Sequence, residues 1–176
     1  MHNIFYNIYE DDNNTIWFIT YDSGLIGRHK KTGQWVQYTA DGKPHSLSSN
    51  KIISIHDDGA GKLWLGTDGG GLNCFDKQSK RFEVYDEQEG VSGIVYGILQ
   101  DDGNNLWLST NNGIIQLSLQ TRKTRIFTNL DNLQSKQFNY NAALKASDGK
   151  LYFGGVNGFN VFHPDSIGEE VIKSQP

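Results

Sequence analysis

A motif built around one large aromatic residue recurs four times and constrains the fold more than any other feature of the chain. The aromatics are Trp17, Trp64, Trp107 and Tyr152, and the intervals between them are 47, 43 and 45 residues. Each stands in a short segment of alternating character that ends in Thr or Gly. A period of this length is the signature of a repeat architecture. We therefore interpret the four aromatics as structural residues that pack between neighbouring repeats.

Each repeat predicts four short strands separated by turns rich in Asp, Asn and Gly. The aromatic motif is the second strand, and a Gly followed by an apolar residue opens the third. The alternation has period two, with no sustained helical period. First strands are expected at 4–9, 52–56, 95–100 and 140–145, and fourth strands at 35–38, 82–85, 125–128 and 169–173.

Four-stranded units that recur every 40 to 50 residues predict an all-β fold of β-propeller blades, with four repeats of four antiparallel strands. The blades are expected at about 4–40, 50–86, 94–128 and 138–173, within one propeller segment over 1–176. Small or polar residues on the first strands, such as Ser54 and Gly97, suit strands that line a crowded axis. An all-β solenoid is the alternative architecture, although solenoid coils are usually shorter.

Four blades are few for a propeller, which typically has four to eight. A small closed ring often carries a disulfide, and the lone Cys74 excludes an internal one. The alternatives are a closed four-blade ring and a partial propeller, and we favour a partial propeller, or one completed by a second copy. A partial propeller would expose two apolar blade faces. We expect such faces to be covered by self-association or by the remaining blades of a parent propeller.

Composition limits the partners. The 176 residues carry a formal net charge of −4, which disfavours nucleic acid and anionic membranes as partners. No apolar run approaches the roughly 18 residues that a membrane span needs, so no direct membrane insertion is expected. The first residues show neither the basic region nor the apolar region of a signal peptide.

Two repeats, residues 55–72 and 101–114, resemble the two-component regulator propeller repeat, and residues 151–165 resemble the final blade of that family. The resemblance covers about residues 4–167. It implies a fragment of the periplasmic sensor region of a Bacteroidetes-type hybrid two-component histidine kinase, anchored in the inner membrane. Such sensors respond to glycans and switch on polysaccharide-utilisation genes. The chain lacks kinase motifs, so it is not expected to be an enzyme itself.

No catalytic residue, metal ligand or cofactor is predicted. His56 beside Asp57 could act as a general base, but we interpret this pair as part of a turn. The acidic turns at 11–14 and 101–105 lack the bidentate Glu and the spacing of a calcium loop. A propeller-type lyase or glycosidase is an alternative that paired carboxylates near the axis would favour. A purely structural assembly module is a third possibility.

The polar loops are the predicted binding surface. In a propeller, the loops that enter the first strands and those that join the second and third strands open onto the same face. Amides, hydroxyls and aromatic rings on these loops suit an oligosaccharide ligand. Loops are also polar in proteins that bind nothing, which is the alternative. The predicted ligand-binding residues are Asn50, Lys51, Tyr96, Asn111, Lys136, Gln137, Asn139, Tyr140 and Asn157, and the same loops carry Tyr21 and Asp68.

Overall fold

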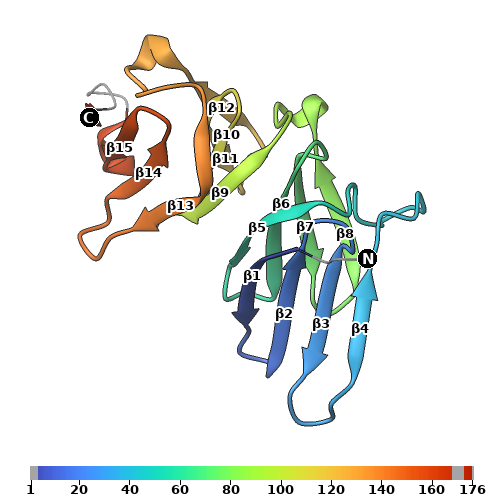
Figure 1. Ribbon diagram of the computed structural model, residues 1–176. Coiled ribbons are helices and arrows are strands. Elements are labelled where there is room, and N and C mark those ends of the chain that lie inside the picture. Colours follow the sequence, from blue (N-terminus) through green and yellow to red (C-terminus); the bar gives the residue numbers. More distant parts are fainter. Residues whose placement is uncertain (1–3, 168–172, 176) are drawn as a thin grey trace.

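The computed structural model describes residues 4–167 and 173–175, which form sixteen strands in four sheets of four (Figure 1). Blade 1 holds β1 (Phe5–Glu10), β2 (Thr15–Thr20), β3 (Leu25–His29) and β4 (Trp35–Tyr38). Blade 2 holds β5 (Ile52–Asp57), β6 (Lys62–Thr67), β7 (Leu72–Asp76) and β8 (Arg81–Tyr85). Blade 3 holds β9 (Val95–Gln100), β10 (Asn105–Thr110), β11 (Gly113–Ser118) and β12 (Thr124–Phe127). Blade 4 holds β13 (Phe138–Lys145), β14 (Leu151–Gly155), β15 (Gly158–Phe162) and β16 (Lys173–Gln175).

Every sheet is an antiparallel meander in sequence order, and the first strands β1, β5, β9 and β13 lie innermost. Three short 3-10 turns interrupt the loops: η1 (Glu87–Glu89), η2 (Asn129–Asp131) and η3 (Pro164–Ser166). The prediction of an all-β fold of four propeller blades, each of four antiparallel strands, is confirmed. The predicted strand at 169–173 falls mostly outside the described residues, and the strand that pairs with β15 is Lys173–Gln175.

The register between first and second strands shifts once in every blade, near the same end of the sheet. In blade 1 the shift lies between Phe5 and Asn7, so Tyr6 is an extra residue. Ile53 and Tyr96 occupy the corresponding places in blades 2 and 3. In blade 4 the shift extends from Phe138 to Ala143. A bulge of this kind redirects the side chain of the extra residue.

Three apolar seams join the four blades. The side chains of Trp17, Trp64 and Trp107 are each at most 2% exposed and lie in separate clusters. Each tryptophan packs with apolar residues from the second strand of the following blade. Those residues are Leu63 and Leu65 in the first seam, Leu106 and Leu108 in the second, and Leu151 and Phe153 in the third.

Unlike the faces joined in the three seams, the outward faces of blades 1 and 4 are not covered by another blade. No fourth apolar cluster joins blade 4 to blade 1 among the described residues. Tyr152, the fourth aromatic of the repeat, is only partly buried. The two end blades meet near the axis, where the Tyr6 and Tyr140 ring centroids are 5.5 Å apart and the Asn141 amide donates to the Tyr6 carbonyl. The four blades thus share an axis but leave two apolar faces exposed.

A buried aspartate fixes the tryptophan in two of the three seams. Asp11 Oδ2 accepts from Trp17 Nε1 at 2.9 Å, and Asp101 Oδ2 accepts from Trp107 Nε1 at 2.8 Å. The other oxygen of each carboxylate accepts backbone N–H groups of the same turn. Asp58 forms the same turn, but Trp64 Nε1 has no hydrogen-bond partner. The recurring aspartate is therefore a structural residue that joins the turn to the seam.

One buried ammonium also links blades 1 and 2. Lys77 Nζ lies 2.8 Å from Asp57 Oδ2 and 3.9 Å from Asp11 Oδ2, and all three side chains are at most 9% exposed. Burial and the neighbouring Asp57 raise the pKa of Tyr9, which lies beside this group, to about 12. A buried charge is costly unless it is paired. The Lys77 ammonium is paired with carboxylates of both blades, so it favours the relative placement of blades 1 and 2 that keeps these pairs.

The substitution Asp101→Ala tests the role of the aspartate. It removes the acceptor of the Trp107 indole and of the Asn105 backbone N–H, and should lower the free energy of unfolding by about 2–3 kcal/mol. Asp58→Ala is the matched control, because it removes only the turn and should cost about 1 kcal/mol. Urea unfolding followed by tryptophan fluorescence measures both. Equal losses would show that the indole bond contributes nothing.

Candidate ligand site on the loop face

Four tyrosines gather where the loops open at one end of the propeller axis. Tyr6 is the bulge residue of β1, Tyr21 follows β2, Tyr96 is the bulge residue of β9, and Tyr140 lies in the irregular part of β13. The ring centroids of Tyr6 and Tyr21 are 5.7 Å apart, and those of Tyr96 and Tyr140 are 5.2 Å apart. Together with the Tyr6–Tyr140 contact, these pairs form a continuous row of rings. We call this group the tyrosine cluster.

Blade 2 contributes one negative and one positive charge to the tyrosine cluster. Asp68 Oδ2 accepts from the Tyr21 hydroxyl at 3.2 Å, and Lys51 Nζ lies 5.1 Å from the centre of the Tyr21 ring. The Asp68 N–H donates to the Lys51 carbonyl at 2.9 Å. This bond joins the loop that enters the first strand of blade 2 to the turn between its second and third strands. The site is therefore built by all four blades, and its geometry depends on how they are placed.

Two phenols of the cluster, those of Tyr96 and Tyr140, have pKa values above the ordinary value for tyrosine. Burial raises the pKa of Tyr96, and the Asp68 carboxylate raises it further. Burial also raises the pKa of Tyr140, with smaller contributions from the neighbouring tyrosines and Asp68. A protonated phenol combines an apolar ring face with a hydroxyl that both donates and accepts hydrogen bonds.

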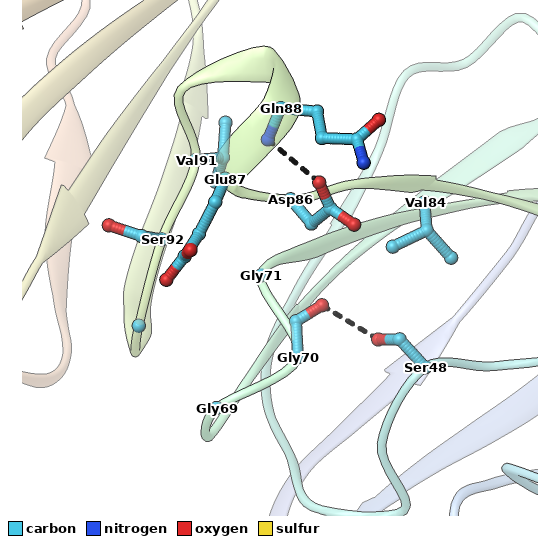
Figure 2. Close-up of a pocket in the computed structure, with 11 residues that line it drawn as sticks. Ser48, Gly69, Gly70, Gly71, Val84, Asp86, Glu87, Gln88, Val91 and Ser92 are labelled. Atoms are coloured by element: carbon cyan, nitrogen blue, oxygen red, sulfur yellow. Dashed lines mark hydrogen bonds between the residues drawn. The ribbon is translucent and has the colours of Figure 1, made fainter.

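A groove of about 450 Å³ lies beside the cluster, between the β6–β7 turn and the segment that leads from β8 to blade 3 (Figure 2). The glycine turn 69–71 forms part of its lining. Gly69 has a positive φ of 87°, and a Cβ there would meet nothing within 4 Å, so the missing side chain leaves open space. The corresponding turn of blade 1 carries Asp22 and Ser23 instead.

The walls of the groove are polar and acidic. Glu87 and Ser92 lie on one side, and Ser48 and Val84 on the other (Figure 2). The Asp86 carboxylate accepts from the Gln88 N–H at 2.9 Å and so holds the start of η1 in place. The Gly69 N–H donates to the Gly93 carbonyl, and Asp68 bridges to Ile94, so one short segment connects the groove to the tyrosine cluster.

Three of the nine predicted ligand-binding residues meet at this site: Lys51, Tyr96 and Tyr140. Tyr140 is 47% exposed, whereas Tyr96 is 8% exposed and presents only part of its ring. The predicted loops do converge on one face, because Tyr21 and Asp68 come from turns between second and third strands, while Lys51 precedes a first strand.

The other six predicted residues lie in the same loops, and the structure gives five of them local hydrogen bonds. The Asn50 side chain accepts from the Ala40 N–H, and the Asn111 side chain accepts from the Ile94 N–H. The remaining three bond through their backbones: Lys136 O accepts from Gly113 N–H, Gln137 N–H donates to Ser135 Oγ, and Asn157 N–H donates to Gln134 Oε1. Asn139 is exposed on β13.

Sequence reasoning did not place Tyr6, Asp86 or Glu87 in the site. Tyr6 holds the same repeat position as Tyr96, one residue before the small or polar residue of the first strand. That equivalence is a signal that could have identified it. Asp86 and Glu87 follow the fourth strand of blade 2 as part of a capping box, and their sequence alone predicts only a turn.

The residues considered for catalysis or metal binding have structural partners. His56 Nε2 lies 3.1 Å from Gln100 Oε1, while Asp57 pairs with Lys77. Across the described ranges, no group of three or more His, Cys, Asp or Glu side chains could hold a metal ion. Cys74 is buried in the second seam, and burial raises the pKa of its thiol to about 12, so it is not a reactive thiolate at neutral pH.

The chain is similar in sequence to proteins of two-component signalling systems. Residues 1–22 and 46–69 match the family model described as two component regulator propeller, which confirms the resemblance inferred from the repeats. A curated relative, Histidine kinase P4 of Formosa agariphila, is 26% identical over 210 residues, covering 90% of this chain and 15% of that protein.

Two solved structures from B. thetaiotaomicron share the fold. The extracellular domain of the hybrid two component system BT3049 has a TM-score of 0.81 at 24% identity, covering 100% of this chain and 25% of that chain. The extracellular domain of BT4673 has a TM-score of 0.78 at 28% identity, covering 99% of this chain and 24% of that one. The chain thus spans about a quarter of these domains and consists of propeller blades, not a kinase domain. In the described part, no helix is long and apolar enough to cross a membrane.

The tyrosine pKa values provide a test of the site. Asp68→Asn should lower the pKa of Tyr96 and Tyr140, because the carboxylate contributes to both upward shifts. Tyr85 is the internal control: burial and Glu83 raise its pKa to about 12, with no contribution from Asp68. NMR of ¹³C-labelled tyrosine rings measures these values. An unchanged Tyr96 titration would contradict the placement of Asp68.

The same shifts set the sign of a pH dependence. Each raised tyrosine pKa stabilises the fold fully below the unfolded value of about 10. This stabilisation is lost as the pH rises through the folded value. The free energy of unfolding of the wild type should therefore fall as the pH rises above about 10. The free energy of unfolding of the Asp68→Asn variant should fall less steeply over the same range, as measured by urea unfolding at each pH.

Proposed function

Because the chain carries two-component regulator propeller repeats, we propose that it is part of the ligand-sensing propeller of a two-component sensor, located outside the cytoplasm in an extracellular or periplasmic region. The observation that carries this proposal is the site on the loop face, which combines the tyrosine cluster of blades 1, 3 and 4 with Asp68 and Lys51 of blade 2. A site shared by all blades is suited to sensing, because a ligand bound there favours one relative arrangement of the blades over others.

The ligand class that suits this surface is an oligosaccharide. The exposed ring of Tyr140 offers an apolar face on which a pyranose can stack, and the phenol hydroxyls bond to sugar hydroxyls. The adjoining groove, at about 450 Å³, lies within the range of small-molecule sites and is lined by backbone groups, hydroxyls and carboxylates. Sugar hydroxyls can donate to these acceptors. The Lys51 ammonium adds one cation for an acidic substituent.

Transmission of the signal would use the same contacts that define the site. Asp68 connects the tyrosine cluster to blade 3 through its bridge with Ile94, and the Asn141 amide connects blade 4 to Tyr6 of blade 1. A ligand that tightens these contacts shifts the population of blade arrangements by its differential affinity. A kinase in the same signalling system would respond to that shift.

Titration calorimetry against a panel of defined neutral and acidic oligosaccharides tests the proposal. For an oligosaccharide that binds, Tyr140→Ala should weaken affinity about five- to thirtyfold, because loss of an aromatic contact of this kind costs about 1–2 kcal/mol. Tyr140→Phe should retain most of the affinity if stacking dominates. Leu130→Ala is the control, since Leu130 is 96% exposed and lies in η2, which contributes no residue to the cluster or to the lining of the groove.

The outcomes separate the parts of the proposal. Binding that is insensitive to Tyr140→Ala would place the ligand elsewhere on the chain. Absence of heat with every oligosaccharide, while the tyrosine titrations confirm the cluster, would exclude this ligand class for the chain.

A further inference from the structure

The outward face of blade 1 is a continuous apolar surface. The ring centroids of Phe5 and Phe18 are 6.1 Å apart, and those of Phe18 and Trp35 are 5.7 Å apart in a stacked arrangement. Phe5 is 54% exposed, Ile8 61% and Trp35 60%. The Arg28 guanidinium covers one side of the indole, at 5.6 Å from the ring centre. A cluster of exposed aromatic side chains of this kind indicates a contact surface.

The repeat itself shows what covers such a face. The strand register of blade 1 matches that of blade 2 position by position. Phe5, Phe18 and Trp35 therefore each have an equivalent residue in blade 2, which pairs with the corresponding position of its own sheet. The equivalents are Ile52, Leu65 and Phe82, which are at most 4% exposed. In blade 2 all three are buried in the first seam, against Trp17 and Leu25 of the preceding blade. The blade 1 face is therefore the receiving half of a seam.

The outward face of blade 4 is the other half. Tyr152 and Phe159 are equivalent to Trp107 and Ile114, which pack into the third seam from blade 3. The Tyr152 and Phe159 ring centroids are 6.1 Å apart, and Phe159 is 37% exposed where Ile114 is fully buried. Leu144, paired with Tyr152, is 61% exposed. The outward faces of blades 4 and 1 are thus two complementary, unequal halves of one kind of contact.

We propose that a second copy of this chain seats its blade 4 face on the blade 1 face, repeating the seam that joins the blades within one copy. The contact is head-to-tail, because each half fits the other half and not itself. Two blade 1 faces placed together would bring two Arg28 side chains into one apolar contact, at a cost in desolvation. Such a contact closes when the rotation between copies permits and otherwise extends into longer oligomers. This inference is independent of the proposed ligand.

Light scattering during size-exclusion chromatography of the 176-residue chain, over a range of concentrations, tests the contact. The wild type should elute as a dimer or larger oligomer whose mass rises with concentration. Trp35→Asp removes the receiving half, and Phe159→Asp removes the inserting half. Each variant alone should be monomeric. Leu130→Asp is the control, since it adds the same charge at a fully exposed site and should behave as the wild type.

Mixing the two variants tests whether the blade 4 face of one copy pairs with the blade 1 face of the other. A 1:1 mixture of Trp35→Asp and Phe159→Asp retains one intact pair of faces, namely blade 4 of the first and blade 1 of the second. The mixture should form a heterodimer and nothing larger. Circular dichroism of each variant confirms that the blades remain folded.

Two results would overturn the proposal. One is a monomeric wild type at every concentration, which would leave the faces to blades of a different chain or segment. The other is a Phe159→Asp variant that still dimerises alone, which would show that blade 1 faces pair with each other.

Discussion

The packing of each tryptophan against the next blade is the contact on which the rest of the structure depends. A four-stranded blade is apolar on both faces and cannot bury either by itself. Trp64 and Trp107 become buried only because the second strands of blades 3 and 4 lie against them. Stability in such an array is close to a sum of blade and seam terms. Three seams serve four blades here, which explains why the interior of the molecule is well packed while its two ends are not.

The candidate site follows from a second constraint, the bulge at the loop-face end of each first strand. The innermost strands are too crowded for large side chains, as Ser54 and Gly97 show. A bulge adds one residue that is freed from the regular alternation. In blades 1 and 3 this residue is Tyr6 and Tyr96, and both rings contact Tyr140. The same irregularity that relieves crowding at the axis therefore supplies the aromatic surface.

Much of the fold could be predicted because it repeats. The aromatic motif, the turn aspartate and the Gly before the third strand recur at fixed offsets, so errors in one blade are corrected by the others. The site does not repeat, and it was predicted only in part. Tyr96 and Tyr140 were identified from their loops, but Tyr6 was not, because its role depends on a bulge that periodicity does not reveal. Loop amides such as Asn50 and Asn111 were predicted as ligand contacts, whereas the structure uses their oxygens to bind backbone N–H groups.

Seams and site are linked through the placement of the end blades. The tyrosine cluster requires Tyr6 of blade 1 and Tyr140 of blade 4 to be in contact, yet no apolar seam of the described residues holds those blades together. Their relative position depends on the three other seams and on polar contacts such as the Asn141 bond to Tyr6. Anything that packs on the outward face of blade 1 or blade 4 therefore also acts on the geometry of the cluster. By the same linkage, a ligand that bridges Tyr6 and Tyr140 alters how those outward faces are presented.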